Sequence, residues 1–258
     1  MSIESQKILF LGKTGQLSSK LFPLVKNKFI VRNPEHLDYE NLRLVGAYLN
    51  DFKPDIIINT VAFTHVDLAE EEKEKAINLN YRFPKNLAQW CKINNSFLVH
   101  YSSDYVFNKQ GTIPIKDEEN HNPINYYGIT KSMGDKAITE LNINGLILRT
   151  SWLYSLSHKS FLKTIIKKIR EENHQKVVKD QIGTPTSASW LADISSQLIN
   201  NKNIAQQFNV INCVPSGYVS WHGFALKIIE ILDTKKVLYK VKNVIPIKTE
   251  QLNMSARR

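Results

Sequence analysis

The chain has 258 residues, of which 42% are hydrophobic and 22% are charged, as is ordinary for a globular protein. It contains no apolar run as long as a membrane span or a signal peptide, and Cys91 and Cys213 stand too far from other ligands to predict a disulfide framework or a zinc site. We therefore expect a cytoplasmic protein without a membrane partner, built as one large domain or as one domain with an appended lobe.

The net charge of +10 would suit a nucleic-acid-binding protein. However, the basic residues are spread along the chain, and the densest group, at 159–170, alternates with apolar residues at helical spacing. None of the known nucleic-acid-binding motifs accompanies this group. We interpret it as the solvent-facing side of a helix and predict no nucleic-acid partner, while the positive charge also suits a phosphorylated small molecule.

A short apolar strand at 7–11 leads into a glycine-containing turn at 12–17. Leu17, Leu21 and Val25 then recur at helical spacing. This order of strand, turn and helix is typical of sites in which backbone N–H groups and a helix N-terminus face a phosphate. It is not a Walker A loop, because Lys7 stands where that motif needs its first glycine.

The turn departs from the usual dinucleotide-binding pattern in one position. Ser18 occupies the place of the third glycine, and Pro23 falls inside the predicted helix, which it should shorten or kink. An ordinary strand–helix turn is the alternative. A second strand at 29–31 ends at Arg32, and an arginine there suits the 2′-phosphate of NADP, with a simple surface arginine as the other interpretation.

The following elements alternate regularly between helix and strand. They are a helix through 42–49, a strand at 54–62, a helical region at 68–91, a strand at 97–107, a helix at 125–141 and a strand at 145–152. This alternation predicts an α/β fold with a doubly wound parallel sheet of the Rossmann type. Asn78 and Asn80 fall within the helical region, and we interpret them as surface residues, with a buried role near the site as the alternative.

The character of the sequence changes after about residue 155. A basic amphipathic helix, a turn at 183–186, a helix at 190–198, a strand at 208–212 and a helix at 221–232 follow. We expect residues 1–155 to form an NAD(P)-binding domain and residues 156–258 to form a smaller substrate-binding lobe. The strand at 208–212 is placed to return to the edge of the sheet.

Candidate catalytic residues stand at the end of one strand and at the start of the next helix. The strand that begins at Phe97 reaches Ser103 and Asp104, and Tyr127 and Lys131 are spaced to share one face of a helix. An ammonium beside a phenol lowers the pKa of the phenol, so Tyr127 is predicted to give a proton to a carbonyl oxygen that also accepts a hydrogen bond from Ser103. Such Tyr–Lys pairs also arise by chance, so the prediction depends on the strands upstream.

The motifs together resemble the dTDP-4-dehydrorhamnose reductase family of the extended short-chain dehydrogenase/reductase superfamily. The similarity runs from Lys7 to about Leu232. It is carried by the segments 12–17, 54–59, 64–70, 101–107, 127–131, 149–154 and 183–186. Each segment is modest by itself, whereas their order and spacing are specific.

The resemblance implies that NADPH or NADH reduces the 4-keto group of a nucleotide-linked 6-deoxyhexose, most simply dTDP-4-dehydro-L-rhamnose. Tyr127 would be the general acid, Lys131 would lower its pKa and bind the ribose, and Ser103, where the family often has Thr, would polarise the ketone. The implied cofactor contacts, with NADPH favoured, are Gly12, Thr14, Gly15, Gln16, Leu17, Arg32, Asp38, Ala62, Thr64, Tyr127 and Lys131. The implied substrate contacts are Ser103, Asp104, Tyr105 and Trp152.

The given sequence ends at Arg258, where family members typically continue with a segment that helps complete the substrate lobe and, in some members, a metal-bridged dimer. We therefore assign no metal site, although Mg²⁺ occurs in the family, and we leave both a monomer and a homodimer open. The alternatives in function are a reductase of another nucleotide 4-keto sugar and a non-catalytic relative, such as the regulatory beta subunit of methionine adenosyltransferase. Trp152 favours a reductase, because its position belongs to the sugar site of the family.

Overall fold

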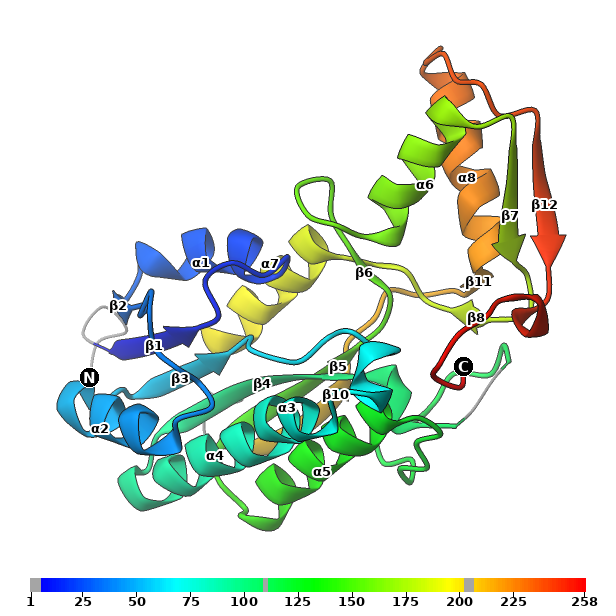
Figure 1. Cartoon of the computed structure of the whole chain (residues 1–258). Helices are drawn as coiled ribbons and strands as arrows, with labels where there is room; N and C mark the ends of the chain where they lie inside the picture. The colour runs from blue at the N-terminus through cyan, green and yellow to red at the C-terminus, as the bar shows by residue number, and fades with distance from the viewer. Residues whose placement is uncertain (1–5, 109–110, 202–206) are drawn as a thin grey trace.

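The computed structural model describes residues 6–108, 111–201 and 207–258. Its larger part is a six-stranded sheet with the order β10-β5-β4-β3-β1-β2, in which every pair of neighbours is parallel (Figure 1). These strands are β1 (Lys7–Leu11), β2 (Ile30–Arg32), β3 (Ile56–Asn59), β4 (Phe97–Ser103), β5 (Gly145–Thr150) and β10 (Phe208–Asn212). The predicted α/β class with a doubly wound parallel sheet is confirmed. The strand order reverses between β1 and β3, and ligands of such sheets bind at the carboxyl ends of the strands beside that point.

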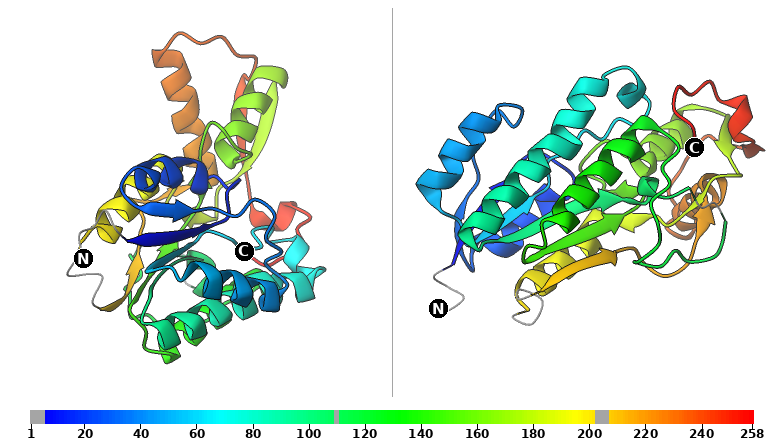
Figure 2. Two further views of the ribbon diagram at one scale, coloured as in Figure 1. Left: turned by 90° about the vertical axis from the view of Figure 1, so that its left-hand side faces the viewer. Right: turned by 90° about the horizontal axis from the view of Figure 1, so that it is seen from below.

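Helices cover both faces of this sheet, as Figure 2 shows from two further sides. The helices α1 and α7 pack on one face, while α2, α4 and α5 pack on the other. Their bounds are α1 (Ser18–Lys26), α2 (Leu42–Phe52), α4 (Phe83–Asn94), α5 (Tyr126–Glu140) and α7 (Ala188–Ile199). Because both faces are covered, β3 is buried along its whole length, which explains the unbroken apolar run that predicted it.

Two strands are shorter than the apolar runs that predict them. The strand β3 occupies only 56–59 of the predicted 54–62. The strand β4 ends at Ser103 rather than at Phe107, because a 3₁₀ turn begins there and covers Asp104–Val106. The hydroxyl of Ser103 accepts a hydrogen bond from the backbone N–H of Tyr105 at 3.3 Å, which satisfies a donor at the start of this turn.

The predicted helical region at 68–91 consists of several short pieces. A 3₁₀ turn at Leu68–Glu70 precedes α3 (Lys73–Ile77), and a π-helical turn at Asn78–Arg82 then joins α3 to α4. Asn80 lies in the π-helical turn and is fully buried, so its interpretation as a surface residue is wrong. Its side chain bonds the backbone N–H of Phe63 at 2.9 Å and the carbonyl of the same residue at 3.1 Å. π-helical turns occur frequently at functional sites.

A smaller lobe stands apart from the sheet at the upper right of Figure 1. It contains α6 (Phe161–Glu171), β7 (His174–Val178), α8 (Trp221–Thr234) and β12 (Asn243–Ile247). The strands β7 and β12 pair in parallel, and the apolar faces of α6 and α8 share one hydrophobic cluster with β7. The basic side of α6 is therefore the side away from this core, as the spacing of its apolar residues predicts.

The chain crosses between the sheet and the lobe more than once. The helix α7 packs against α1, and β10 pairs with β5, so both return to the sheet although they follow residue 155. Short strand pairs lie along the crossings, namely β6 (Leu153–Tyr154) with β9 (Thr186–Ser187) and β8 (Ile182–Gly183) with β11 (Val219–Ser220). The division of the chain into two domains between residues 155 and 156 stays a prediction. The crossings show that α7 and β10, which follow residue 155, contact the sheet domain.

Candidate active site

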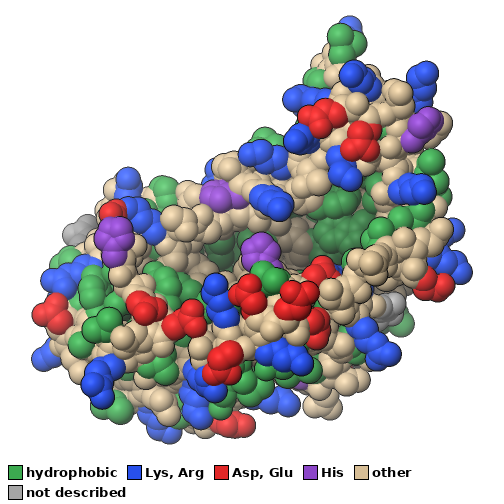
Figure 3. All heavy atoms as spheres, in the orientation of Figure 1, with side chains coloured by type: hydrophobic (Ala, Val, Ile, Leu, Met, Phe, Trp, Pro, Cys, Tyr) green, Lys and Arg blue, Asp and Glu red, His purple; other side chains and the backbone are tan. Residues whose placement is uncertain are grey.

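The predicted site residues gather at one edge of the sheet, because the carboxyl ends of parallel strands meet at the same edge. The glycine-containing turn follows β1, Ser103 ends β4, and Trp152 follows β5 by two residues. Figure 3 shows that the molecular surface is hollowed between this side of the sheet and the smaller lobe, with hydrophobic side chains in the hollow. The structure thus brings the turn and the strand ends to a common opening.

The start of α5 holds Tyr127 against the end of β4. The side chain of Asn125 caps this helix by accepting a hydrogen bond from the N–H of Gly128 at 2.8 Å. Only a glycine fits at 128, because a Cβ there would lie 2.2 Å from the carbonyl oxygen of Tyr105. The rings of Tyr105 and Tyr127 then pack edge to face with centroids 5.5 Å apart. This packing fixes the phenol of Tyr127 beside the hydroxyl of Ser103.

The environment of Tyr127 differs from the prediction in one respect. Burial raises the pKa of its phenol above the ordinary value, and the hydrogen bond with Ser103 opposes this effect only in part. The expected net lowering of the pKa of Tyr127 toward the working pH is therefore wrong for this structure, since desolvation dominates. The ammonium of Lys131 is directed instead to the backbone carbonyl of Tyr101, at a distance of 2.6 Å.

Lys131 is itself buried, with only 1% of its surface exposed. Burial lowers the pKa of this ammonium to about 8, although the carboxylate of Asp135 acts in the opposite direction. At pH 7 the side chain therefore still carries its charge, and a moderate rise in pH removes it. A buried amine with a pKa near the working pH is typical of functional sites.

His100 contacts Lys131 from the middle of β4, and no pattern in the sequence predicts this contact. The imidazole is completely buried, with Nε2 3.4 Å from Nζ of Lys131 and Nδ1 3.1 Å from Nδ2 of Asn59. The amide of Asn59 is oriented by its Oδ1, which accepts the N–H of Val61 at 3.0 Å. The amide nitrogen of Asn59 is thereby turned toward the imidazole. Burial and the nearby charge of Lys131 lower the pKa of His100, so the ring is neutral.

A small pocket beside the predicted catalytic residues contains three of the predicted substrate contacts. Its lining includes Asp104, Tyr105 and Trp152, together with Gln181 and Arg258. Burial raises the pKa of Asp104 to about 6, while a hydrogen bond from the hydroxyl of Ser103 at 3.0 Å works against this rise. The pocket thus offers aromatic rings, a carboxyl group and a guanidinium close to Tyr127.

The final residues of the chain lie at this pocket, which the sequence did not predict. The guanidinium of Arg258 forms an ion pair with Asp67 at 2.7 Å and lies 5.9 Å from the ring centre of Tyr105. The backbone carbonyl of Arg257 accepts a hydrogen bond from Asn125 at 2.8 Å. These contacts place a positive charge at the mouth of the pocket, and only the tertiary structure brings it there.

The turn after β1 has the geometry of a phosphate-binding turn. Gly12 adopts a positive φ of 93°, and a Cβ there would lie 2.5 Å from Oγ1 of Thr60. Its N–H donates to the hydroxyl of Tyr39 at 3.2 Å, while Thr14 and Gly15 are exposed. No side chain caps the first turn of α1, and its Ser19 and Lys20 N–H groups donate to the carbonyls of Gly15 at 3.1 Å and Leu17 at 3.0 Å, while the exposed backbone of Thr14 and Gly15 stays open to a ligand. The turn therefore fits a pyrophosphate.

Ser18 is accommodated where the third glycine is usual. Its side chain is completely buried, and its hydroxyl lies 2.8 Å from Oγ1 of Thr60. Thr60 in turn donates to the carbonyl of Leu11 at 2.6 Å. The serine hydroxyl thus gains a partner at the end of β3, and α1 stays close to the sheet without a glycine at this position.

The remaining predicted cofactor residues differ in their burial and in their contacts. Leu17 is buried in the core of the sheet, and the side chain of Gln16 accepts a hydrogen bond from Ser155 at 3.0 Å. Arg32 forms an ion pair with Asp51 at 2.9 Å and its side chain is about half exposed. Of the other three predicted residues, Asp38 and Thr64 are exposed and Ala62 is partly exposed.

Comparison with known proteins agrees with this geometry. Residues 6–258 match the family model described as the RmlD substrate binding domain. The chain belongs to the dTDP-4-dehydrorhamnose reductase family. Among its relatives, the dTDP-4-dehydrorhamnose reductase of Escherichia coli strain K12 is 35% identical over 86% of this chain and 77% of its own length. That of Aggregatibacter actinomycetemcomitans is 30% identical over 98% of this chain and 88% of its own length.

Solved structures of this reductase family have the same fold. The dTDP-4-dehydrorhamnose reductase of Bacillus anthracis strain Ames in complex with NADP has a TM-score of 0.88 and 32% identity, over 98% of this chain and 88% of that chain. The ortholog from Clostridium acetobutylicum has a TM-score of 0.88 and 34% identity, over 98% of this chain and 87% of that chain. The family resemblance predicted from the sequence is confirmed.

This member of the dTDP-4-dehydrorhamnose reductase family also has a buried ion pair behind its catalytic helix. The guanidinium of Arg149 donates to Oδ2 of Asp135 at 3.0 Å, and the two side chains are 7% and 1% exposed. Arg149 also contacts Nε2 of His121 at 2.8 Å and the carbonyl of Asp117 at 2.9 Å. The ion pair therefore ties α5, which carries Tyr127, to β5 and to the loop before α5.

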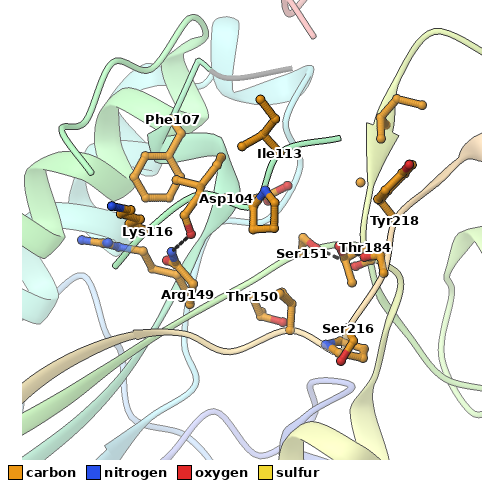
Figure 4. Close-up of a pocket in the computed structure, with 18 of the residues that line it drawn as sticks. Asp104, Phe107, Ile113, Lys116, Arg149, Thr150, Ser151, Thr184, Ser216 and Tyr218 are labelled. Carbon is orange, nitrogen blue, oxygen red and sulfur yellow. Dashed lines mark hydrogen bonds between the residues drawn. The ribbon is translucent and has the colours of Figure 1, made fainter. Parts of the chain in front are cut away.

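A larger pocket of about 720 Å³ adjoins this ion pair (Figure 4). It shares Asp104 and Phe107 with the small pocket and extends between two loops, at 111–118 and 212–218. The hydroxyl of Ser151 donates to the carbonyl of Thr184 at 2.6 Å on its wall. Its size falls in the range of pockets that bind small molecules.

In the three described ranges, no three His, Cys, Asp or Glu side chains come together in a way that could hold a metal ion. Within the same ranges, no helix is both long enough and apolar enough to cross a bilayer. The predicted contacts of the site residues with cofactor and substrate stay predictions.

Proposed function

We propose that this chain reduces the 4-keto group of dTDP-4-dehydro-L-rhamnose to the alcohol of dTDP-L-rhamnose, with Tyr127 as the proton donor. Membership of the reductase family supplies the enzyme class, an NAD(P)H-dependent oxidoreductase, and confirms the class expected from the sequence. The observation that supports the roles of individual residues is the meeting of Ser103, Tyr127 and Lys131 beside a pocket lined by Asp104 and aromatic rings.

The chemistry requires a hydride, a proton and stabilisation of a developing charge. The reduced nicotinamide supplies the hydride when it is bound. As the carbonyl oxygen becomes an alkoxide, the phenol of Tyr127 transfers its proton to that oxygen, and the hydroxyl of Ser103 exchanges Asp104 for this oxygen as its hydrogen-bond acceptor. A high pKa keeps Tyr127 protonated until the alkoxide, which is a much stronger base, has formed. The buried ammonium of Lys131 then stabilises the phenolate that remains.

The cofactor would lie across the carboxyl ends of β1 and β3. The turn that contains Gly12 and Gly15 would bind its pyrophosphate, and Arg32 at the end of β2 would meet the ribose 2′-phosphate of NADPH. Because Arg32 already pairs with Asp51, it would exchange this carboxylate for the phosphate. Replacing Arg32 by Ala should therefore weaken NADPH binding more than NADH binding, and an equal loss for both would make Arg32 a surface residue only.

Tyr127→Phe tests the proposed donor directly. The variant keeps the ring and removes the transferable proton, so kcat should fall by about 10²- to 10⁴-fold. The binding of NADPH, measured by cofactor fluorescence, should stay nearly unchanged. Ser103→Ala should cost less, because only one hydrogen bond to the oxygen is lost. Near-normal turnover of Tyr127→Phe, with an unchanged pH dependence, would rule out this assignment.

The alternatives differ in what the unaltered protein does with a panel of substrates. Oxidation of NADPH should be followed with dTDP-, GDP- and UDP-linked 4-keto sugars. Turnover only with another sugar would replace the substrate and keep the residue roles. Binding of NADPH without turnover of any sugar would favour a non-catalytic relative that acts as a regulatory subunit. The oligomeric state, as monomer or homodimer, and any use of Mg²⁺ stay predictions.

A further inference from the structure

Trp152 has an unfavourable backbone conformation, and neighbouring residues hold its side chain in place. Its φ is +44°, a left-handed conformation that is unfavourable for a bulky side chain and persists only when the surrounding structure holds it. The indole of Trp221 stacks on the indole of Trp152, with ring centres 3.4 Å apart and planes inclined by 6°. Gly183 touches the same ring, since a Cβ there would lie 2.5 Å from Cε2 of Trp152.

Trp221 is the first residue of α8, so it belongs to the smaller lobe. Its Nε1 donates to Oε1 of Gln181 at 3.1 Å, and its ring contacts the ring of Phe161 with centres 4.4 Å apart. Gln181 is held in turn, because its Nε2 donates to Oγ1 of Thr249 at 3.1 Å. Several segments of the lobe therefore fix the plane of this indole.

The two tryptophans differ in their relation to the small pocket. Trp152 lines the pocket beside Asp104 and Tyr105, whereas Trp221 is absent from its lining and touches Trp152 from behind. Gln181, the hydrogen-bond partner of Trp221, also lines the pocket. The orientation of the aromatic wall of the pocket thus depends on a residue that does not belong to that wall.

We propose that Trp221 is a positioning residue, which together with Gly183 holds the indole of Trp152 so that its free edge contacts the deoxyhexose. This inference rests on the proposed function, because it assigns Trp152 to the sugar site. Trp221 covers one face of this indole and Gly183 lies against the other, so the edge that lines the pocket is the part left to contact the sugar. The stack with Trp221 removes the rotational freedom of Trp152 before the sugar binds, which lowers the cost of binding.

Trp221→Leu should therefore act on the sugar and not on the cofactor. Misplacing a group in a site by about 1 Å can cost on the order of 100-fold, so we expect KM for the nucleotide sugar to rise by roughly 10- to 100-fold. The dissociation constant of NADPH should stay within about 2-fold, since the cofactor turn follows β1 of the sheet whereas Trp221 begins α8 in the lobe. Trp221→Phe keeps an aromatic ring on Trp152 and should restore much of the lost affinity.

A spectroscopic readout tests the stack without reference to activity. Two parallel indoles in contact couple their transitions, so the unaltered protein should show an exciton couplet in circular dichroism. The couplet should vanish in Trp221→Leu. Trp190→Leu is the matched control, because Trp190 lies on α7 against the core of the sheet and its loss also removes one tryptophan. That variant should keep both the couplet and the KM.

The outcomes separate this inference from the proposed function. Loss of the couplet with a raised KM for the sugar, at unchanged NADPH affinity, supports the positioning role. An unchanged KM in Trp221→Leu, despite loss of the couplet and normal turnover of the unaltered protein, overturns the inference and leaves the function intact. Gly183→Ala, which pushes on the indole through a different residue, should raise KM as well. A protein that neither turns over nor binds the dTDP-linked sugar overturns both.

Discussion

The buried ammonium of Lys131 should make the stability of the protein depend on pH in a specific direction. Its pKa falls from an ordinary value of 10.5 to about 8 in the folded state because of burial. Between these two pH values the folded protein has lost the proton while the unfolded chain still binds it, so the free energy of unfolding rises with pH. At about 1.4 kcal/mol per pH unit, the full effect amounts to roughly 3 kcal/mol. It is complete above pH 10.5 and is lost as the pH falls to about 8.

Urea unfolding of the unaltered protein and of Lys131→Met, at intervals from about pH 7 to about pH 10, would measure this effect. Tyr101 and Cys91 also have raised pKa values through burial, but they titrate in both proteins and cancel in the difference. The loss of the hydrogen bond to the carbonyl of Tyr101 adds a constant that does not vary with pH. The difference in unfolding free energy should therefore grow by roughly 3 kcal/mol in favour of the unaltered protein as the pH rises. A difference that stays flat would show that Lys131 keeps an ordinary pKa, and the reasoning from burial would fail.

Two further predictions concern the packing around α5. Asp135→Asn leaves the buried guanidinium of Arg149 without its carboxylate, so urea unfolding should show a loss of about 3–5 kcal/mol, and a loss below about 1 kcal/mol would contradict the burial of this pair. Gly134→Ala places a Cβ 2.2 Å from the carbonyl oxygen of Asn80, so it should destabilise by about 1–3 kcal/mol despite the better helix propensity of alanine. Gly46→Ala in α2 is its control, since it meets no atom within 4 Å and should stabilise by up to about 1 kcal/mol; equal effects of the two substitutions would disprove the close approach.

The part of the site that follows from chain topology could be predicted from the sequence. Periodicity located β1 and β4 closely enough to place the glycine turn and Ser103 at their carboxyl ends. Helical spacing put Tyr127 and Lys131 on one face of α5. Because parallel strands end at a common edge, these local features were sufficient to bring the residues together. The parallel order of the sheet follows from the same alternation.

Features that depend on tertiary partners could not be predicted in this way. The burial of Asn80 depends on a close approach of α5, which no local pattern of its own segment encodes. His100 occupies an ordinary position in an apolar strand, and its contact with Lys131 comes from a helix that is distant in sequence. The predicted lowering of the pKa of Tyr127 was wrong for a related reason. The spacing shows that a lysine is near, but it does not show how deeply both groups are buried.

Because the chain crosses repeatedly between sheet and lobe, cleaving it at one position cannot yield two intact parts. A polypeptide that stopped at residue 155 would lack β10 and α7, so β5 would become an open edge and one face of α1 would lose its cover. The lobe is attached through separate connections that precede α6, follow β7 and precede α8, with the final residues returning to Asp67 and Asn125. The backbone of Ala256 and the guanidinium of Arg258 both bond Asp67, which lies in the loop after β3. Widening the opening between sheet and lobe would break these contacts, so the ion pair of Arg258 with Asp67 opposes it.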